Sequence, residues 1–215
     1  MSTPLPLFPL KTVLFPGTLL PLHIFEPRYQ QLLADVTAGD RRFGLLPPGE
    51  TGGLPGPGAV GCRALVRAVQ PLPDGRSNIV VGGEHRFVFL EPYPAGTPYH
   101  VGLVDPVEDA PDIQVPSDEE VARLRSLAER YAAALNTIRD QAIDVELPAE
   151  AADLSFQVAG LLEWEFEARQ SLLESRSATA RVTRLLHALP ALVTDAELRA
   201  AIHHNARSNG TGGRR

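Results

Sequence analysis

The 215 residues, of which 44% are hydrophobic and 21% charged, indicate a globular chain of one large domain or two small lobes that can bury a core without disulfides or metal ions. The net charge of -6 argues against a nucleic-acid binder, because such a protein presents a basic face to the phosphates. With one cysteine, no signal-peptide pattern and no apolar run long enough to span a bilayer, a cytoplasmic protein is expected.

Proline and glycine divide the chain into two parts. Eighteen of the 20 prolines and 14 of the 18 glycines precede residue 117. Before that point, short apolar runs between turn residues predict a β-rich lobe over residues 1–116. A helical lobe is predicted over residues 117–207, and a disordered tail over residues 208–215, which lack an apolar anchor. The predicted strand runs are residues 5–10, 18–25, 42–46, 59–69, 77–82, 86–90 and 100–104.

Turn and cap residues mark the connections inside the β-rich lobe. One helix is predicted to begin at Pro27 and to stop at Gly39. The Pro-Asp-Gly sequence of residues 73–75 predicts a tight turn between two antiparallel strands. Residues 49–58, rich in glycine and proline, predict a mobile surface loop, and the Gly-Gly-Glu sequence of residues 82–84 predicts a turn or a bulge.

The helical lobe begins with a capping box formed by Ser117 and Glu120. Apolar residues then recur at helical spacing as far as Ile138, which predicts a long amphipathic helix. The further helices predicted are one opened by Pro148, segments at residues 165–174 and 178–189, and a short final helix that starts at a second capping box, Thr194 with Glu197.

The residue types that carry catalysis or hold metals form no recognisable set. Histidines lack zinc-ligand spacing, and the acidic stretch of residues 105–120 matches no calcium loop. Cys62 lies within a predicted strand, where a small buried residue is the ordinary explanation. The only lysine, Lys11, follows leucine where a phosphate-binding loop needs glycine, which excludes a Walker-type nucleotide site. No metal, cofactor or catalytic residue is therefore predicted.

Three segments together resemble a known protein family. Residues 5–29, LPLFPLKTVLFPGTLLPLHIFEPRY, are similar to the opening of the N-terminal substrate-binding domain of ATP-dependent Lon proteases. Residues 58–86 resemble the family's hairpin with its V-x-G-x-x-R end, and residues 169–174 resemble a segment of its helical part. The ending of the first segment is typical of stand-alone bacterial relatives. The motif residues to which the resemblance gives a structural role are Glu26, Pro27, Arg28, Tyr29, Gly83 and Arg86.

The resemblance implies an α+β fold, in which a PUA-like β pseudo-barrel is followed by a helical bundle. In full-length Lon this domain captures unfolded or tagged proteins for an ATPase and a Ser-Lys protease. The ATPase and protease domains are both expected to be missing here, because the chain ends where the connecting helix of Lon would begin. The implied function is that of a non-enzymatic module that binds exposed apolar or unfolded segments, or a partner protein.

Free sheet edges and apolar clefts are the features expected to bind such segments. An endogenous protease or chaperone is a further candidate partner, and no membrane is expected. The alternative is a PUA-like RNA-binding module, but residues 1–116 carry 8 basic and 11 acidic groups and residues 117–215 carry 12 and 15, so each part is at -3. The candidate peptide-binding residues are Phe15, Leu19, Leu20, Leu22 and Leu54.

Overall fold

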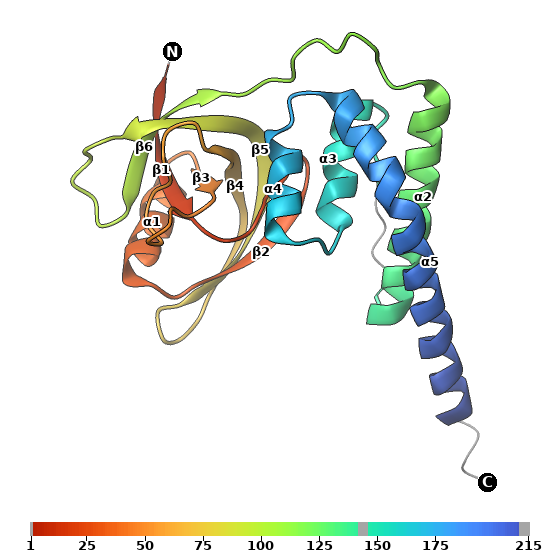
Figure 1. Cartoon of the computed structure of the whole chain (residues 1–215). Coiled ribbons are helices and arrows are strands. Elements are labelled where there is room, and N and C mark those ends of the chain that lie inside the picture. The colour runs from red at the N-terminus through yellow and green to blue at the C-terminus, as the bar shows by residue number, and fades with distance from the viewer. Residues whose placement is uncertain (1, 142–145, 211–215) are drawn as a thin grey trace. The chain divides into compact units, whose positions relative to one another are not determined.

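The computed structural model describes residues 2–141 and 146–210, and the chain divides into two compact units (Figure 1). The β unit comprises Met1–Ala110 with Glu163–Arg176, and the helical unit comprises Pro111–Leu162 with Ser177–Arg215. The sequence-based division at residue 116 differs from this in one segment in particular. Residues 163–176, expected in the helical lobe, pack with the strands.

The described part of the β unit forms a closed sheet with two helices. The strand order is β2-β5-β4-β3-β1-β6, and β6 also pairs with β5, which closes the sheet and leaves β2 as an edge strand. All pairs are antiparallel except β1 with β3. The predicted α+β class with a β pseudo-barrel is confirmed. The elements are β1 (Thr3–Pro9), β2 (Leu19–Ile24), α1 (Pro27–Ala38), β3 (Arg42–Leu46), β4 (Val60–Pro71), β5 (Ser77–Pro92), β6 (His100–Pro106) and α4 (Phe166–Glu174).

Alternating side chains fill the interior of the barrel, since successive residues of a strand point to opposite faces. A Cβ atom on Gly61 of β4 would lie 2.5 Å from Cζ of Phe87, so glycine there makes room for the aromatic ring. The buried core cluster consists of Leu5, Leu7, Leu46, Phe87, Phe89 and Val104.

Several local predictions for the β unit are confirmed. Helix α1 begins at Pro27 and is followed by Gly39, whose N–H donates to the carbonyl of Val36. The turn at residues 73–75 joins β4 and β5, with Gly75 at a φ of 84°. Residues 49–58 contain no helix or strand.

The two strands predicted at residues 77–82 and 86–90 are one continuous strand, β5. Residues 82–84 lie inside it, so the turn alternative is wrong and the bulge alternative is correct. The register with β4 shifts there: Cys62 pairs with Arg86, but Ala64 pairs with Gly83. An extra residue of β5 is accommodated, as a bulge allows.

The described part of the helical unit contains α2 (Asp118–Arg139), α3 (Ala151–Leu161) and α5 (Ala178–Gly210). The capping box of α2 is confirmed, because the Ser117 hydroxyl accepts from the Glu120 N–H and the Glu120 carboxylate accepts from the Ser117 N–H. Helix α5 packs along α2. None of the helices in the described ranges is long and apolar enough to cross a membrane.

The predicted interruption between residues 189 and 194 is wrong. Helix α5 continues through Pro190, and the Thr194 hydroxyl donates to the carbonyl of Pro190 at 2.9 Å instead of capping a new helix. Burial of Leu185, Leu189 and Val193 on one side of α5 outweighs the hydrogen bond that proline removes. Of the tail predicted to be disordered, residues 208–210 belong to α5 and residues 211–215 lie outside the described residues.

Candidate functional site

Strand β2 presents a free edge with exposed apolar side chains. Within the described residues it pairs only with β5. The side chains of its even-numbered residues point toward the barrel interior, and the last of them, Ile24, is buried. By contrast, the side chain of Leu19 is 68% exposed and that of Phe25, just beyond the strand, is 60% exposed. An unpaired edge of this kind is a template for pairing with another extended chain.

The backbone parity of β2 determines what that edge offers. The carbonyl of Thr18 accepts from the N–H of Gly83 on β5. Because backbone groups alternate in direction along an antiparallel strand, the even-numbered residues of β2 direct theirs toward β5. Leu19, Pro21 and His23 therefore direct their backbone groups toward the free edge. Pro21 has no N–H, which is the usual position of proline in an edge strand. The free edge therefore has acceptors at all three residues and donors only at Leu19 and His23.

A hollow of about 440 Å³ lies across β2, β5 and β4. We call it the β2 hollow. The strand register places a row of apolar residues beside a row of polar residues on this face. The exposed Phe25 ring lies next to the polar row and stacks on His23, with the two ring centroids 6.1 Å apart. This combination suits an extended chain that carries both apolar side chains and amide groups. The rows that share this face are Pro21–Val80–Ala68 and His23–Asn78–Gln70.

The candidate peptide-binding residues differ in their exposure and in whether they lie at the β2 hollow. Leu19 is exposed beside the β2 hollow, and Leu22 lines it. Leu20 is half-buried, and Leu54 is half-buried against the core cluster. Phe15 is 0% exposed, so its side chain is unavailable to a ligand, contrary to expectation. Sequence reasoning left out His23 and Phe25, although the alternation from Leu19 onward places both on the outer face.

The motif of residues 26–29 braces the start of α1. Glu26 and Arg28 form an ion pair at 2.9 Å, and the Arg28 guanidinium lies 4.5 Å from the centroid of the Tyr29 ring. Tyr29 is buried against Phe8 with ring centroids 3.9 Å apart, and burial raises the pKa of its hydroxyl. The motif connects α1 to the barrel core, in agreement with a structural role.

Arg86 attaches α4 to β5. Its side chain is almost fully buried, donates to the carbonyls of Leu173 at 2.8 Å and Ser175 at 2.6 Å, and pairs with Asp109. Carbonyls at a helix C-terminus favour a cation. These bonds explain why α4 belongs to the β unit although it follows α3 in the chain.

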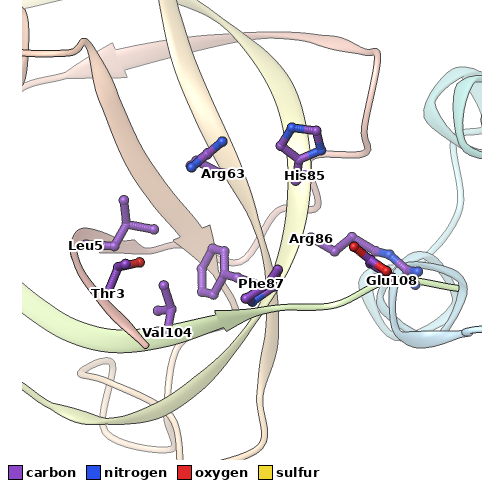
Figure 2. A pocket seen from close by; sticks show the side chains of 9 residues that line it. Thr3, Leu5, Arg63, His85, Arg86, Phe87, Val104 and Glu108 are labelled. Carbon is purple, nitrogen blue, oxygen red and sulfur yellow. The ribbon is translucent and has the colours of Figure 1, made fainter. Parts of the chain in front are cut away.

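A second cavity, of about 400 Å³, opens over the core cluster, and Figure 2 shows the side chains that line it. We call it the barrel pocket. Leu5, Phe87 and Val104 are its apolar part, and Arg63 and His85 lie on β4 and β5 at its polar side.

Glu84 joins three strands beside this pocket. Its carboxylate accepts from Nε of Arg42 at 2.8 Å, from Nη2 of Arg42 at 3.0 Å and from Nε of Arg63 at 3.0 Å. The bonds from Arg42 are the main cause that lowers the pKa of Glu84 below its usual value. Since the Glu84 side chain is only 15% exposed, these charge-assisted bonds are partly shielded from water.

We expect Glu84→Gln to lower the free energy of unfolding by about 1–2 kcal/mol at neutral pH. A carboxyl with a lowered pKa stabilises the fold above its unfolded-state pKa, and that contribution is lost as the pH falls through the folded-state pKa. The difference between the two proteins should therefore shrink at acidic pH. Urea unfolding across this range measures it, with the exposed Glu91→Gln as control; a constant difference would contradict the assignment.

The described residues contain no group of three histidine, cysteine, aspartate or glutamate side chains placed to hold a metal ion. Burial raises the pKa of the Cys62 thiol to about 12, so the reactive thiolate is scarce at neutral pH.

Comparison with known proteins agrees with this geometry. The family model of the ATP-dependent protease La (LON) substrate-binding domain matches residues 4–190. The chain belongs to this family. It is 27% identical over 210 residues to the Lon protease of Cytophaga hutchinsonii, covering 93% of this chain and 25% of that protein. It therefore spans about a quarter of the length of that relative.

Solved structures of Lon N-terminal domains share the fold. The Lon N-terminal domain protein from Xanthomonas campestris is 27% identical, with a TM-score of 0.64 over 86% of this chain and 98% of the other. The N-terminal domain of the Mycobacterium avium complex Lon protease has a TM-score of 0.63 over 90% and 99%, and at 16% identity it shows the fold alone. The resemblance drawn from the sequence motifs is confirmed, and the matched family is a substrate-binding domain.

Proposed function

We propose that the protein is a non-enzymatic module that binds unfolded or extended segments of other proteins at the outer face of β2. The observation that carries the proposal is the free edge of β2 beside the β2 hollow, with Leu19 and Phe25 exposed at its two ends. Membership of a substrate-binding family supports binding as the role.

The chemistry of the surface favours an extended apolar client. Main-chain hydrogen bonds to a strand edge give affinity without sequence preference, and exposed apolar side chains select segments that folded proteins keep inside. The interruption of donors at Pro21 limits the added ladder to a short stretch, which favours weak, exchangeable binding over permanent association.

A titration with a permanently unfolded, carboxymethylated model protein tests this function. We expect saturable binding by fluorescence anisotropy, weakened about tenfold by the double substitution Leu19→Ser and Phe25→Ser. Both side chains are exposed, so the fold is expected to tolerate the change. The control is Ile113→Ser, a fully exposed apolar residue of the helical unit. Absence of saturable binding, while a Lon N-domain binds under the same conditions, would remove the proposal.

The location in the cytoplasm stays a prediction. It rests on the single cysteine, which is free and buried. Cell fractionation with detection of the untagged protein tests it.

A further inference from the structure

The barrel pocket has an apolar floor that is already part of the folded core. Leu5, Phe87 and Val104 belong to the core cluster and are 8%, 3% and 6% exposed. A cavity of about 400 Å³ lies within the range of about 300–1,000 Å³ usual for small-ligand sites. The floor is held by barrel packing, so a ligand would meet a preformed apolar surface.

Arg63 and His85 supply hydrogen-bond donors above this floor, and Figure 2 shows both on the same side of Phe87. The bond from Nε of Arg63 to Glu84 fixes the guanidinium and leaves its two terminal nitrogens available. Across the described ranges, neither these nitrogens nor the imidazole of His85 has a hydrogen-bond partner. A guanidinium oriented in this way is suited to bind a carboxylate.

The other charged residues that line the pocket, Arg86 and Glu108, favour an anion beside Arg63 and His85 over one at their own end. Arg86 also lines the pocket, but its guanidinium is engaged with Asp109 and two carbonyls of the α4 region. The carboxylate of Glu108 faces the pocket near Arg86 in Figure 2 and would repel an anion there. As a hydrogen-bond acceptor, it suits an N–H group of the same ligand.

We propose that the barrel pocket binds the carboxyl-terminal residue of a protein chain when that residue is apolar. Its carboxylate is held by Arg63 and His85, its side chain rests on the apolar floor, and its backbone N–H faces Glu108. A chain end combines these three groups on adjacent atoms, whereas an internal aspartate or glutamate lacks the apolar group beside its carboxylate.

This pocket is separate from the outer face of β2, and its residues do not overlap with those of the β2 hollow. It goes beyond the function proposed above, because it recognises a chain end and not an extended segment. The two proposals fail independently: the Leu19 and Phe25 substitutions are expected to leave binding of a short chain end unchanged.

The test is a fluorescence-polarisation titration of the full chain with a short labelled peptide that ends in leucine. We expect the free carboxylate to bind, and the same peptide with a terminal carboxamide to bind about tenfold more weakly or not at all. Peptides ending in leucine are also expected to bind better than those ending in aspartate. Equal binding of the acid and the amide overturns the proposal without any protein variant.

Protein variants then locate the site. Arg63→Gln and His85→Gln are each expected to weaken binding of the free acid by about tenfold and to have little effect on the residual binding of the amide. His85 is exposed and forms no hydrogen bond within the described residues, so its variant is expected to fold even if Arg63→Gln is destabilised. Arg123→Gln, the same change at an exposed position of α2, is the control.

A small-molecule competitor tests whether the terminal residue alone is recognised. N-acetyl-leucine carries the carboxylate, the apolar side chain and the N–H group that the pocket is proposed to hold, so it is expected to compete with the peptide, whereas N-acetyl-leucinamide, which lacks the carboxylate, is not. If the two compete equally, or if His85→Gln and Arg63→Gln bind like the unaltered protein, the assignment of the terminal residue to this pocket is wrong.

Discussion

A Gly83→Ala variant is expected to lose about 3 kcal/mol or more of its free energy of unfolding. A Cβ atom on Gly83 would lie 2.1 Å from the carbonyl oxygen of Phe15. That oxygen also accepts from the hydroxyl of Thr18 at 2.8 Å, which holds the segment ahead of β2 in place. Because the crowding atom belongs to the backbone, no side-chain rotation relieves the overlap, and β5 must separate from this segment.

The neighbouring glycine is a matched control. A Cβ atom on Gly82 would meet Nε of Arg67 at 3.0 Å, and Arg67 is an exposed side chain that can move. Gly82→Ala should therefore change the free energy of unfolding by no more than about 1 kcal/mol, and alanine in a strand even favours the folded state slightly. Urea unfolding followed by circular dichroism compares the two. Similar losses of unfolding free energy in both variants would show that the closeness of the Phe15 carbonyl to Gly83 does not cause the destabilisation.

Elements set by local chemistry could be predicted from the sequence. Pro27 and Gly39 mark both ends of α1 because each acts on its own backbone position. The turn at residues 73–75 and the cap at Ser117 likewise depend on neighbours only a few residues away. For such features the sequence contains the whole cause, so the prediction needs no knowledge of packing.

Elements decided by distant contacts could not be predicted in this way. Pro190 is a local signal for a helix end, but burial of one side of α5 overrides it. The helix predicted at residues 165–174 is α4, yet its membership of the β unit depends on bonds to Arg86, far away in the chain. Local patterns do not specify such partners.

The candidate site shows the same division. Alternation along β2 indicates which side chains share a face, but the strand order decides that its edge is free. Phe15 is a candidate from its place in the segment ahead of β2, but its ring is buried, with the guanidinium of Arg169 5.5 Å from its centroid, and that distant partner has no signal in the local sequence. Arg63 and His85 had no sequence signal as a pair, because the β5 bulge places them together.

Arg86→Met is expected to lower the free energy of unfolding by about 3–5 kcal/mol. Arg86 is 4% exposed, and its loss leaves Asp109 and the carbonyls of Leu173 and Ser175 without their cationic partner. Methionine fills similar space but replaces none of these bonds. Arg86→Lys keeps the charge, but its one nitrogen cannot occupy both positions from which Nη1 and Nη2 of Arg86 donate, so an intermediate loss is expected.

Hydrogen exchange distinguishes loss of the α4 attachment from a general loosening of the barrel. Amides of α4 should lose protection in Arg86→Met at denaturant concentrations where those of β3 and β4 keep theirs, because Arg86 bonds directly to the end of α4. Arg67→Met, at an exposed position of β4, is expected to change stability by less than about 0.5 kcal/mol. Unchanged protection of α4 in Arg86→Met would mean that apolar packing by Leu172 and Leu173, both buried, is sufficient to hold the helix.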